Sequence, residues 1–104
     1  RVVGTALSER AFTVVLPQLT AVNGLLFAFG AARDRGSAYD LVWGATPSGM
    51  TELLAQDSDG TRDSMLYALY VEDIGDGATG TRTLTTASAA GDVEYVAGIL
   101  LNIY

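Results

Sequence analysis

The fold is decided by residues 64–87, which read SMLYALYVEDIGDGATGTRTLTTA. In Ser64–Glu72 the alternate residues Met65, Tyr67, Leu69 and Val71 line one face, with the two-residue period of a strand. The same run also fits a helical stripe, but less well. Threonine recurs through Thr81–Ala87, and its branched Cβ favours strands over helices. The glycine-rich segment between these two runs is typical of a turn, so the stretch predicts two strands joined by a loop.

The loop, Gly75–Gly80, also matches the G-x-G-x-x-G pattern of dinucleotide-binding segments. Such a segment needs a helix after it, because the helix N-terminus faces the pyrophosphate. A threonine-rich strand follows here instead, and the carboxylate of Asp76 would repel a phosphate. We therefore interpret Gly75–Gly80 as a connection between strands.

Clusters of turn-forming residues divide the rest of the chain into runs of about six to twelve residues, a spacing typical of all-β sandwiches and barrels. The links are short enough for antiparallel neighbours. The sequence therefore predicts one domain, residues 1–104, folded as an antiparallel β-sandwich of seven or eight strands. Residues 1–10 form either the first strand or an extended N-terminal arm. The other expected strands are Val2–Leu7, Ala11–Leu16, Leu25–Ala31, Tyr39–Ala45 and Val93–Tyr104.

The same alternation assigns one face of each strand to the core. Truncating one of the larger core residues, as in Phe27→Ala, should then cost about 3–5 kcal/mol. The residues expected to point mostly inward are Phe12, Val14, Leu16, Leu25, Phe27, Phe29, Leu41, Met65, Tyr67, Leu69, Tyr95, Ala97 and Ile99.

The last run, residues 93–104, is apolar on both of its faces. Its apolar residues also fit a helical stripe, but Gly98 and the β-branched side chains favour a strand buried on both sides. A two-layer sandwich covers only one of these faces, so we expect the other face to contact a second subunit. The residues assigned to this interface are Val96, Leu100 and Tyr104.

Composition excludes several classes of chemistry. The chain has 6 basic residues, all arginine, against 12 acidic residues, a formal net charge of −6, and neither His nor Cys. A Ser-His-Asp triad, a thiolate nucleophile, a Cys/His zinc site and the lysine of a P-loop are therefore impossible. The negative charge opposes binding to nucleic acid, whose affinity for proteins comes largely from basic residues.

Apolar residues make up 49% of the chain and charged residues 17%, whereas an average soluble chain has about 25% charged residues. This surplus indicates either a well-filled core or an apolar surface that binds a protein partner. The longest nearly apolar stretch, Leu19–Ala32, is interrupted by polar residues and is too short to span a bilayer.

Three carboxylates around a glycine form a weak candidate for calcium binding, at Asp57, Asp59 and Asp63. Oxygen ligands at alternate positions with a glycine at the turn are typical of Ca²⁺ loops. The glutamate that completes an EF-hand is missing, so a solvated Asp-Gly turn is the simpler interpretation. We expect no other cofactor.

Two further chemistries involve carboxylates and aromatic rings. Paired carboxylates can hydrolyse glycosides without His or Cys, but no spacing in the sequence selects such a pair, and we expect no enzymatic activity. Aromatic rings could stack on sugars if they point outward, although a lone Trp in a small sandwich more often belongs to the core. The residues of this possible sugar platform are Tyr39, Trp43 and Tyr70.

Five short motifs follow one another over about residues 11–104. They are Leu25–Leu26, Trp43–Gly44, Met50–Thr51 with Leu53, Ser64–Tyr67 with Leu69, and Thr83–Thr85. Their order resembles that of a jelly-roll-like β-sandwich domain that recurs in structural proteins of tailed phages and in bacterial surface proteins. Ala45 stands where the pattern has a second glycine.

The resemblance implies a non-enzymatic structural or assembly module that binds other copies of itself or a larger protein assembly. Its most concrete version is a capsid-decorating, head-fibre or tail protein of a phage-like particle, located in the virion or outside the cell. One alternative is a carbohydrate-binding or adhesive module of a secreted bacterial protein. Another is a pilin-like filament subunit, in which Arg1–Leu7 would complete the sheet of a neighbour by strand addition.

Overall fold

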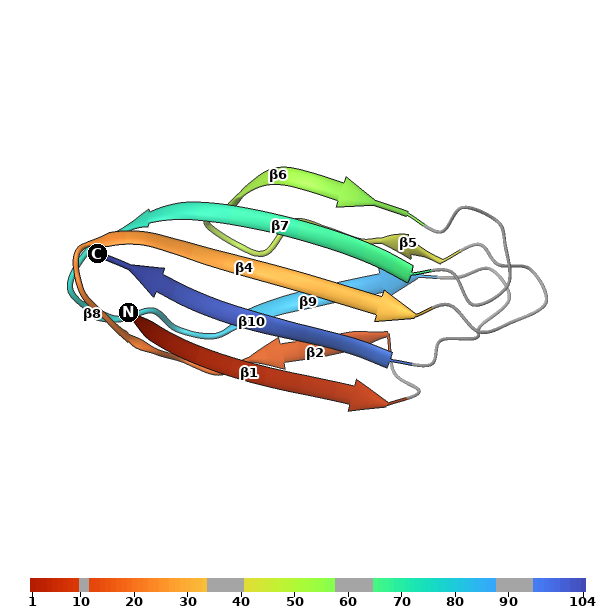
Figure 1. Ribbon diagram of the computed structural model, residues 1–104, viewed down its shortest axis with the longest axis horizontal. Helices are drawn as coiled ribbons and strands as arrows, with labels where there is room; N and C mark the ends of the chain where they lie inside the picture. Colours follow the sequence, from red (N-terminus) through yellow and green to blue (C-terminus); the bar gives the residue numbers. More distant parts are fainter. Residues whose placement is uncertain (10–11, 34–40, 58–64, 88–94) are drawn as a thin grey trace.

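The computed structural model describes residues 1–9, 12–33, 41–57, 65–87 and 95–104. Strands account for 72% of the described residues, and none of these residues lies in a helix. The strands form two layers in an elongated molecule with principal extents of 45 × 22 × 18 Å (Figure 1). The all-β sandwich predicted from the sequence is therefore confirmed.

The described strands are β1 (Val2–Glu9), β2 (Thr13–Leu16), β3 (Thr20–Ala21), β4 (Gly24–Arg33), β5 (Val42–Trp43), β6 (Thr51–Gln56), β7 (Met65–Ile74), β8 (Gly77–Ala78), β9 (Arg82–Ala87) and β10 (Tyr95–Ile103). Two-residue strands raise the number above the seven or eight expected. Of the two alternatives for the N-terminal segment, β1 shows that it is a strand of the sandwich.

The larger layer is a five-stranded antiparallel sheet in the order β1-β10-β4-β7-β6. The smaller layer is a three-stranded sheet in the order β2-β9-β5. A short third pair, β3 with β8, lies at the end of the molecule where the chain passes between the layers (Figure 1).

One continuous two-stranded ribbon runs through both layers. It consists of β2 paired with β9, β3 with β8 and β4 with β7, and in every pair the numbers of the partnered residues add up to 98. The ribbon extends from the pair Thr13 and Thr85 to the pair Arg33 and Met65. Rolling such a ribbon into two sheets produces a jelly-roll-like strand order.

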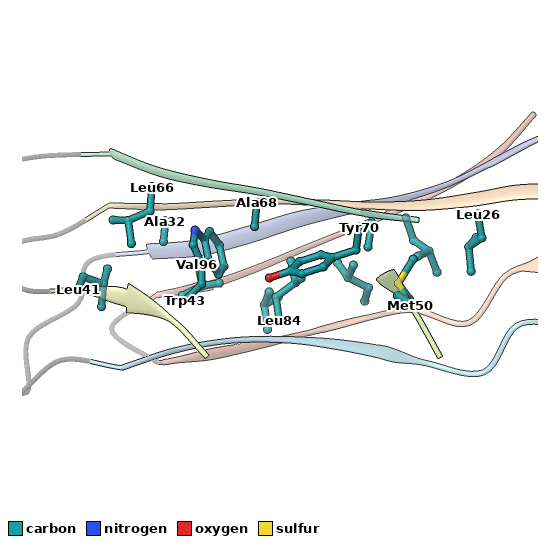
Figure 2. Close-up of a cluster of buried hydrophobic side chains, with 14 of the residues drawn as sticks. Leu26, Ala32, Leu41, Trp43, Met50, Leu66, Ala68, Tyr70, Leu84 and Val96 are labelled. Atoms are coloured by element: carbon teal, nitrogen blue, oxygen red, sulfur yellow. The ribbon is translucent and has the colours of Figure 1, made fainter. Parts of the chain in front are cut away.

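The core lies between the facing sides of the two large sheets, and Figure 2 shows its side chains. The three-stranded sheet and its flanks supply large residues, among them Leu16, Trp43 and Leu84. These large side chains pack against the five-stranded sheet at two glycines, Gly30 and Gly98. A Cβ on Gly30 would lie 2.9 Å from both Leu84 Cδ1 and Trp43 Cη2, and one on Gly98 would lie 2.6 Å from Leu84 Cδ1. The sheets can therefore approach closely because these two positions carry no side chain.

The predicted core is correct near the three-stranded sheet and wrong for the five-stranded one. Val14, Leu16 and Leu41 are buried, and Phe12 packs partly buried against the core. In β4 and β10 the inward side is the one with the smaller residues, such as Ala28, Gly30 and Gly98, because these leave room for the large side chains opposite. In β7 the inward side also carries the large buried side chain of Tyr70. The residues expected inside that lie on the outward side are Leu25, Phe27, Phe29, Met65, Tyr67, Leu69, Tyr95, Ala97 and Ile99.

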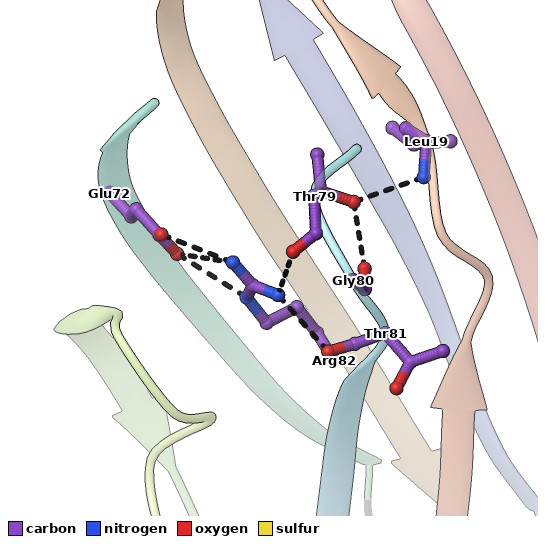
Figure 3. A network of polar contacts seen from close by, with 6 residues as sticks. All are labelled: Leu19, Glu72, Thr79, Gly80, Thr81 and Arg82. Atoms are coloured by element: carbon purple, nitrogen blue, oxygen red, sulfur yellow. Dashed lines mark hydrogen bonds and ion pairs between the residues drawn. The ribbon is translucent and has the colours of Figure 1, made fainter. Parts of the chain in front are cut away.

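A buried ion pair joins the two layers near the glycine-rich turn (Figure 3). The guanidinium of Arg82 on β9 donates to both carboxylate oxygens of Glu72 on β7, at 3.0 and 3.1 Å, and also to the carbonyls of Thr79 and Thr81. The Thr79 hydroxyl accepts a hydrogen bond from the amide of Leu19 at 3.0 Å. Every partner in this network belongs to the fold, so we assign the network a structural role.

Asn102 on β10 is a fully buried polar residue. Its Oδ1 accepts from the amide of Val22 at 2.8 Å, and its Nδ2 donates to the carbonyls of Val22 and Leu25 at 3.0 and 3.2 Å. These bonds tie the last strand to the segment that leads into β4.

Candidate interaction surface

The candidate site is the outer face, which we define as the side of the five-stranded sheet turned away from the three-stranded sheet. Partnered residues of antiparallel strands lie on the same side of a sheet, so the registers bring alternate residues of four strands together here. The outer face consists of Val3, Thr5 and Leu7 on β1; Tyr95, Ala97, Ile99, Leu101 and Ile103 on β10; Leu25, Phe27, Phe29, Ala31 and Arg33 on β4; and Met65, Tyr67, Leu69, Val71 and Asp73 on β7.

The outer face is apolar and open to solvent in the single chain. Ile99 at its centre is 41% exposed, and its cross-strand partner Phe29 is 40% exposed. The ring of Phe29 stacks on that of Tyr67, with ring centroids 6.5 Å apart. Isolated exposed apolar residues are ordinary, whereas a contiguous patch of this kind marks a binding surface.

Charge is confined to the ends of the outer face. Among its residues whose side chains are described, the charged ones are Arg33 and Asp73. The registers place Arg33 beside Tyr95 and Met65 at one end, and Asp73 beside Leu25 at the other. The middle of the face therefore presents hydrocarbon and aromatic groups.

Two shallow hollows mark the outer face. One of about 290 Å³ lies toward the Ile103 end and is lined by Phe27, Phe29, Leu69, Ile99, Leu101 and Ile103. A second of about 350 Å³ lies toward the opposite end, where its lining includes Leu7, Met65 and Tyr95. Both hollows are open, so they can receive the protruding side chains of another protein.

The outer face continues onto β6 at the border of the sheet. Leu54 partners Leu69 in the register, which puts it on this side, and it is 53% exposed. A bulge between Glu52 and Leu54 interrupts the pairing of β6 with β7. The apolar surface therefore reaches the β6 border, and that border is irregular.

The predicted interface residues do not form a surface. Val96 and Leu100 are fully buried between the sheets, and Tyr104, beyond the end of β10, is 62% exposed. The assignment of the two faces of the last strand was therefore reversed. The inward face of β10 carries Gly98, which admits Leu16 and Leu84 from the other sheet, so this side belongs to the core.

The possible sugar platform is wrong as an exposed surface. Trp43 and Tyr70 are buried in the core (Figure 2), and Tyr39 lies outside the described residues. The indole Nε1 of Trp43 donates to the carbonyl of Gln56 at 3.1 Å. Burial raises the pKa of the Tyr70 hydroxyl above its usual value of 10.0, and the negative charges of Glu52 and Asp57 raise it further.

The calcium candidate is described in the structure only at Asp57, since Asp59 and Asp63 lie outside the described residues. Asp57 Oδ1 accepts a hydrogen bond from the amide of Trp43 at 2.9 Å, which joins β5 to the end of β6. No cluster of three or more potential metal ligands occurs within the described ranges. Gly75–Gly80 joins β7 to β9, but it is not only the loop that the sequence predicted, because Gly77–Ala78 within it forms the short strand β8, which pairs with β3.

The alternation in the sequence contained a signal for the outer face that our assignment did not use. One side of β4 carries Ala28, Gly30 and Ala32, whereas the other side carries Phe27 and Phe29. Small residues on one face of a strand allow a second sheet to approach closely, and large ones on both sheets would not fit the narrow space between layers.

Comparisons with known proteins do not place the chain in a family. No family model, curated protein or solved structure matches it. Within the described residues, no helix has the length and apolar character needed to cross a membrane.

Proposed function

We propose that this protein is a non-enzymatic structural module that assembles with other copies of itself through the outer face. The observation that carries the proposal is the exposed apolar surface over β1, β10, β4 and β7, with described charges only at its ends. Water-exposed hydrocarbon of this extent is favourably buried against a matching surface.

The size of the outer face suits a stable interface. Strands lie about 4.8 Å apart and residues rise about 3.3 Å along a strand, so the face spans about 20 by 30 Å, or about 600 Å² in projection. A standard interface buries about 800 Å² of accessible surface on each partner, and the accessible area of a ridged face exceeds its projection.

The charge and shape of the outer face are compatible with a second copy as the occupant. Each copy carries a net charge of −6, which opposes association wherever acidic surfaces meet. The middle of the outer face avoids this repulsion because its described side chains are uncharged. Two twisted sheets also pack face to face at about −30°, so the outer faces of two copies can pack on each other as two sheets of a sandwich do.

The more specific version of this proposal is a capsid-decorating, head-fibre or tail component of a phage-like particle, found in the virion or outside the cell. Its supports are the order of motifs in residues 11–104 and the jelly-roll-like strand order. The alternative of a carbohydrate-binding module has lost its expected surface, because Trp43 and Tyr70 are buried.

The test compares two matched substitutions on opposite sides of the sandwich. Ile99→Asp introduces a carboxylate at the centre of the outer face, and Val15→Asp introduces one at a 54% exposed site on the three-stranded sheet. We expect the parent to self-associate as its concentration rises in sedimentation equilibrium. Ile99→Asp should weaken this association by about tenfold or more, because a carboxylate is costly to bury in a contact.

Val15→Asp should associate like the parent, and all three proteins should give the same far-UV circular dichroism spectrum. A parent that stays monomeric at every concentration would refute assembly with itself. Equal weakening by both substitutions would show that the contact does not involve the outer face.

A further inference from the structure

We propose that the free border of β1 is a second interaction site, at which β1 of a second copy adds in antiparallel orientation to form one continuous sheet across two molecules. This site is separate from the outer face, because it consists of the backbone groups at the edge of the sheet. It does not rest on the function proposed above.

The two borders of the five-stranded sheet differ. β1 ends the strand order on one side and β6 ends it on the other (Figure 1). β6 has six residues and carries a bulge, whereas β1 pairs with β10 over eight consecutive residues without a shift in register. In the described part of the chain, no strand pairs with the other side of β1.

Natural sheets protect their borders with proline, lysine or other charges, bulges, or short strands. The segment Val2–Ser8 has no proline, charge or bulge, and its length is close to the usual upper range for strands. Within the described ranges its outward amide and carbonyl groups have no strand partner, while the β6 border has protection of the usual kind.

The sequence of β1 is compatible with a second copy of itself. Antiparallel pairing about a two-fold axis at Thr5 sets Thr5 opposite Thr5 of the second copy, and sets Val3 opposite Leu7 on the outer-face side. On the inward side it sets Gly4 opposite Ala6, so that small residues meet. Cross-strand Thr-Thr and apolar pairs of this kind stabilise antiparallel sheets.

The ends of this pairing are also compatible. The same register sets Arg1 opposite Glu9 of the second copy, and these residues carry opposite charges. In the neighbouring two-fold registers the partners match less well, because an axis at Gly4 sets Arg1 opposite Leu7 and an axis at Ala6 sets Glu9 opposite Val3. The axis is perpendicular to the sheet, so the outer faces of both copies would lie on the same side and form one apolar surface of twice the width.

Single cysteines test this register directly, because the chain has no cysteine of its own. Antiparallel partners have Cα atoms about 4.5–5.5 Å apart, within the range of about 4.4–6.8 Å that a disulfide allows. Thr5 is exposed, so we expect Thr5→Cys to form a disulfide-linked dimer under mild oxidation.

Val3→Cys is the matched control. Val3 is 47% exposed on the same strand, but the proposed register leaves two copies of position 3 about 14 Å apart along the strand. It should cross-link at least about tenfold less than Thr5→Cys. Mixing Val3→Cys with Leu7→Cys should restore cross-linking between the two variants, which mass spectrometry distinguishes by mass.

The same Thr5→Cys substitution in the Ile99→Asp background separates this proposal from the function proposed above. Cross-linking at position 5 should persist there, because the β1 border does not include Ile99. A Thr5→Cys protein that stays monomeric would overturn the β1 proposal. Equal cross-linking through Val3→Cys alone would overturn the register. Loss of the cross-link at position 5 in the Ile99→Asp background would show that contact through the outer face, not the β1 border, brings the copies together.

A charge at the two-fold axis gives an independent measurement. Made in the Ile99→Asp background, where contact through the outer face is already weakened, Thr5→Lys would set two positive charges directly opposite each other, and we expect the remaining dimerisation to weaken by about fivefold. Thr83→Lys places the same charge at an exposed threonine on the outward side of the three-stranded sheet, away from both the β1 border and the outer face, and should have no effect. An unchanged dimerisation constant for Thr5→Lys would contradict the proposal.

Discussion

The two sides of the five-stranded sheet are both apolar, yet one is the core and the other is open to solvent. The inward side of β4 and β10 includes Ala28, Gly30 and Gly98, while the outer face of the same strands includes Phe27 and Phe29. The larger and more hydrophobic side chains therefore lie on the side that remains exposed. Burial in this sandwich follows the fit to the second sheet rather than the hydrophobicity of each residue.

The reason is that large side chains from the three-stranded sheet fill most of the space between the two layers. Facing sheets lie about 10 Å apart, and interiors are packed as densely as organic crystals. The three-stranded sheet fills this space with Leu16, Trp43 and Leu84, so the facing positions must be small. The outer face meets no such partner within the described part of the chain and can carry aromatic rings.

The strongest test of the comparison uses two adjacent residues of β10. Leu100 is fully buried and Ile99 is 41% exposed. Leu100→Asp places an unpaired carboxylate in the core and should cost about 5 kcal/mol or more, which is comparable with the whole stability of a small domain. We expect Leu100→Asp to be unfolded by circular dichroism and Ile99→Asp to be folded. The reverse outcome would show that the faces are assigned the wrong way round.

A second test removes the buried side chain of Asn102, which forms three hydrogen bonds on the inward side of the sheet. Asn102→Ala would remove three hydrogen bonds to Val22 and Leu25 and leave backbone groups without partners. We expect a loss of about 3 kcal/mol in the free energy of unfolding, measured by urea denaturation. Thr5→Ala, at an exposed site of β1, is the control and should change stability by less than about 0.5 kcal/mol. A loss below about 1 kcal/mol for Asn102→Ala would mean that water replaces the amide.

Gly98 and Ala97 compare the space available on the two sides. Gly98→Ala puts a methyl group 2.6 Å from Leu84 Cδ1 and 2.7 Å from Leu16 Cδ2, so these side chains must shift, and we expect a loss of about 2 kcal/mol. Ala97→Val adds volume on the outer face, where it should change stability by less than about 0.5 kcal/mol. Thermal unfolding of both variants measures the difference. Equal losses would show that the outer side is as tightly packed as the core.

Tyr70 gives the smallest effect and one that depends on pH. Its pKa is raised above 10.0 in the folded chain, first by burial and then by the charges of Glu52 and Asp57. Its contribution to stability is fully present below the unfolded value of about 10 and is lost as pH rises through the folded pKa. The parent should therefore lose stability at alkaline pH faster than Tyr70→Phe. Urea denaturation at about pH 8 and about pH 11 measures this, and parallel losses would contradict it.

The sequence predicted the class of fold and most of the long strands, because period-two alternation and turn residues act locally. It did not predict which side of β4, β7 and β10 is buried. That choice depends on which residues of β2, β5 and β9 face them, and these lie far away in the sequence. The expected interface was consequently assigned to Val96 and Leu100.

The last strand does have the property that the sequence predicted for residues 93–104. Both sides of β10 are apolar, and the sandwich covers only one of them. The uncovered side is the one with Ile99 and Ile103 rather than the one with Leu100. The exposure of Trp43 and Tyr70 does not follow from the sequence, because single-residue patterns do not distinguish an aromatic ring in a core from one on a surface.

The pairs β2 with β9, β3 with β8 and β4 with β7 share one register, in which the numbers of the partnered residues add up to 98. An error in pairing would therefore affect the whole ribbon rather than one pair of strands. A shift of one residue between Thr13–Arg33 and Met65–Thr85 would turn one side of the ribbon over relative to the other in both layers at once. Phe29 would then share a side with Ala68, and Leu16 would leave the core together with Leu26. The two sheets thus share one alignment, and a shift in one pair moves the others with it unless the unpaired residues between them, such as 17–19 and 79–81, absorb it.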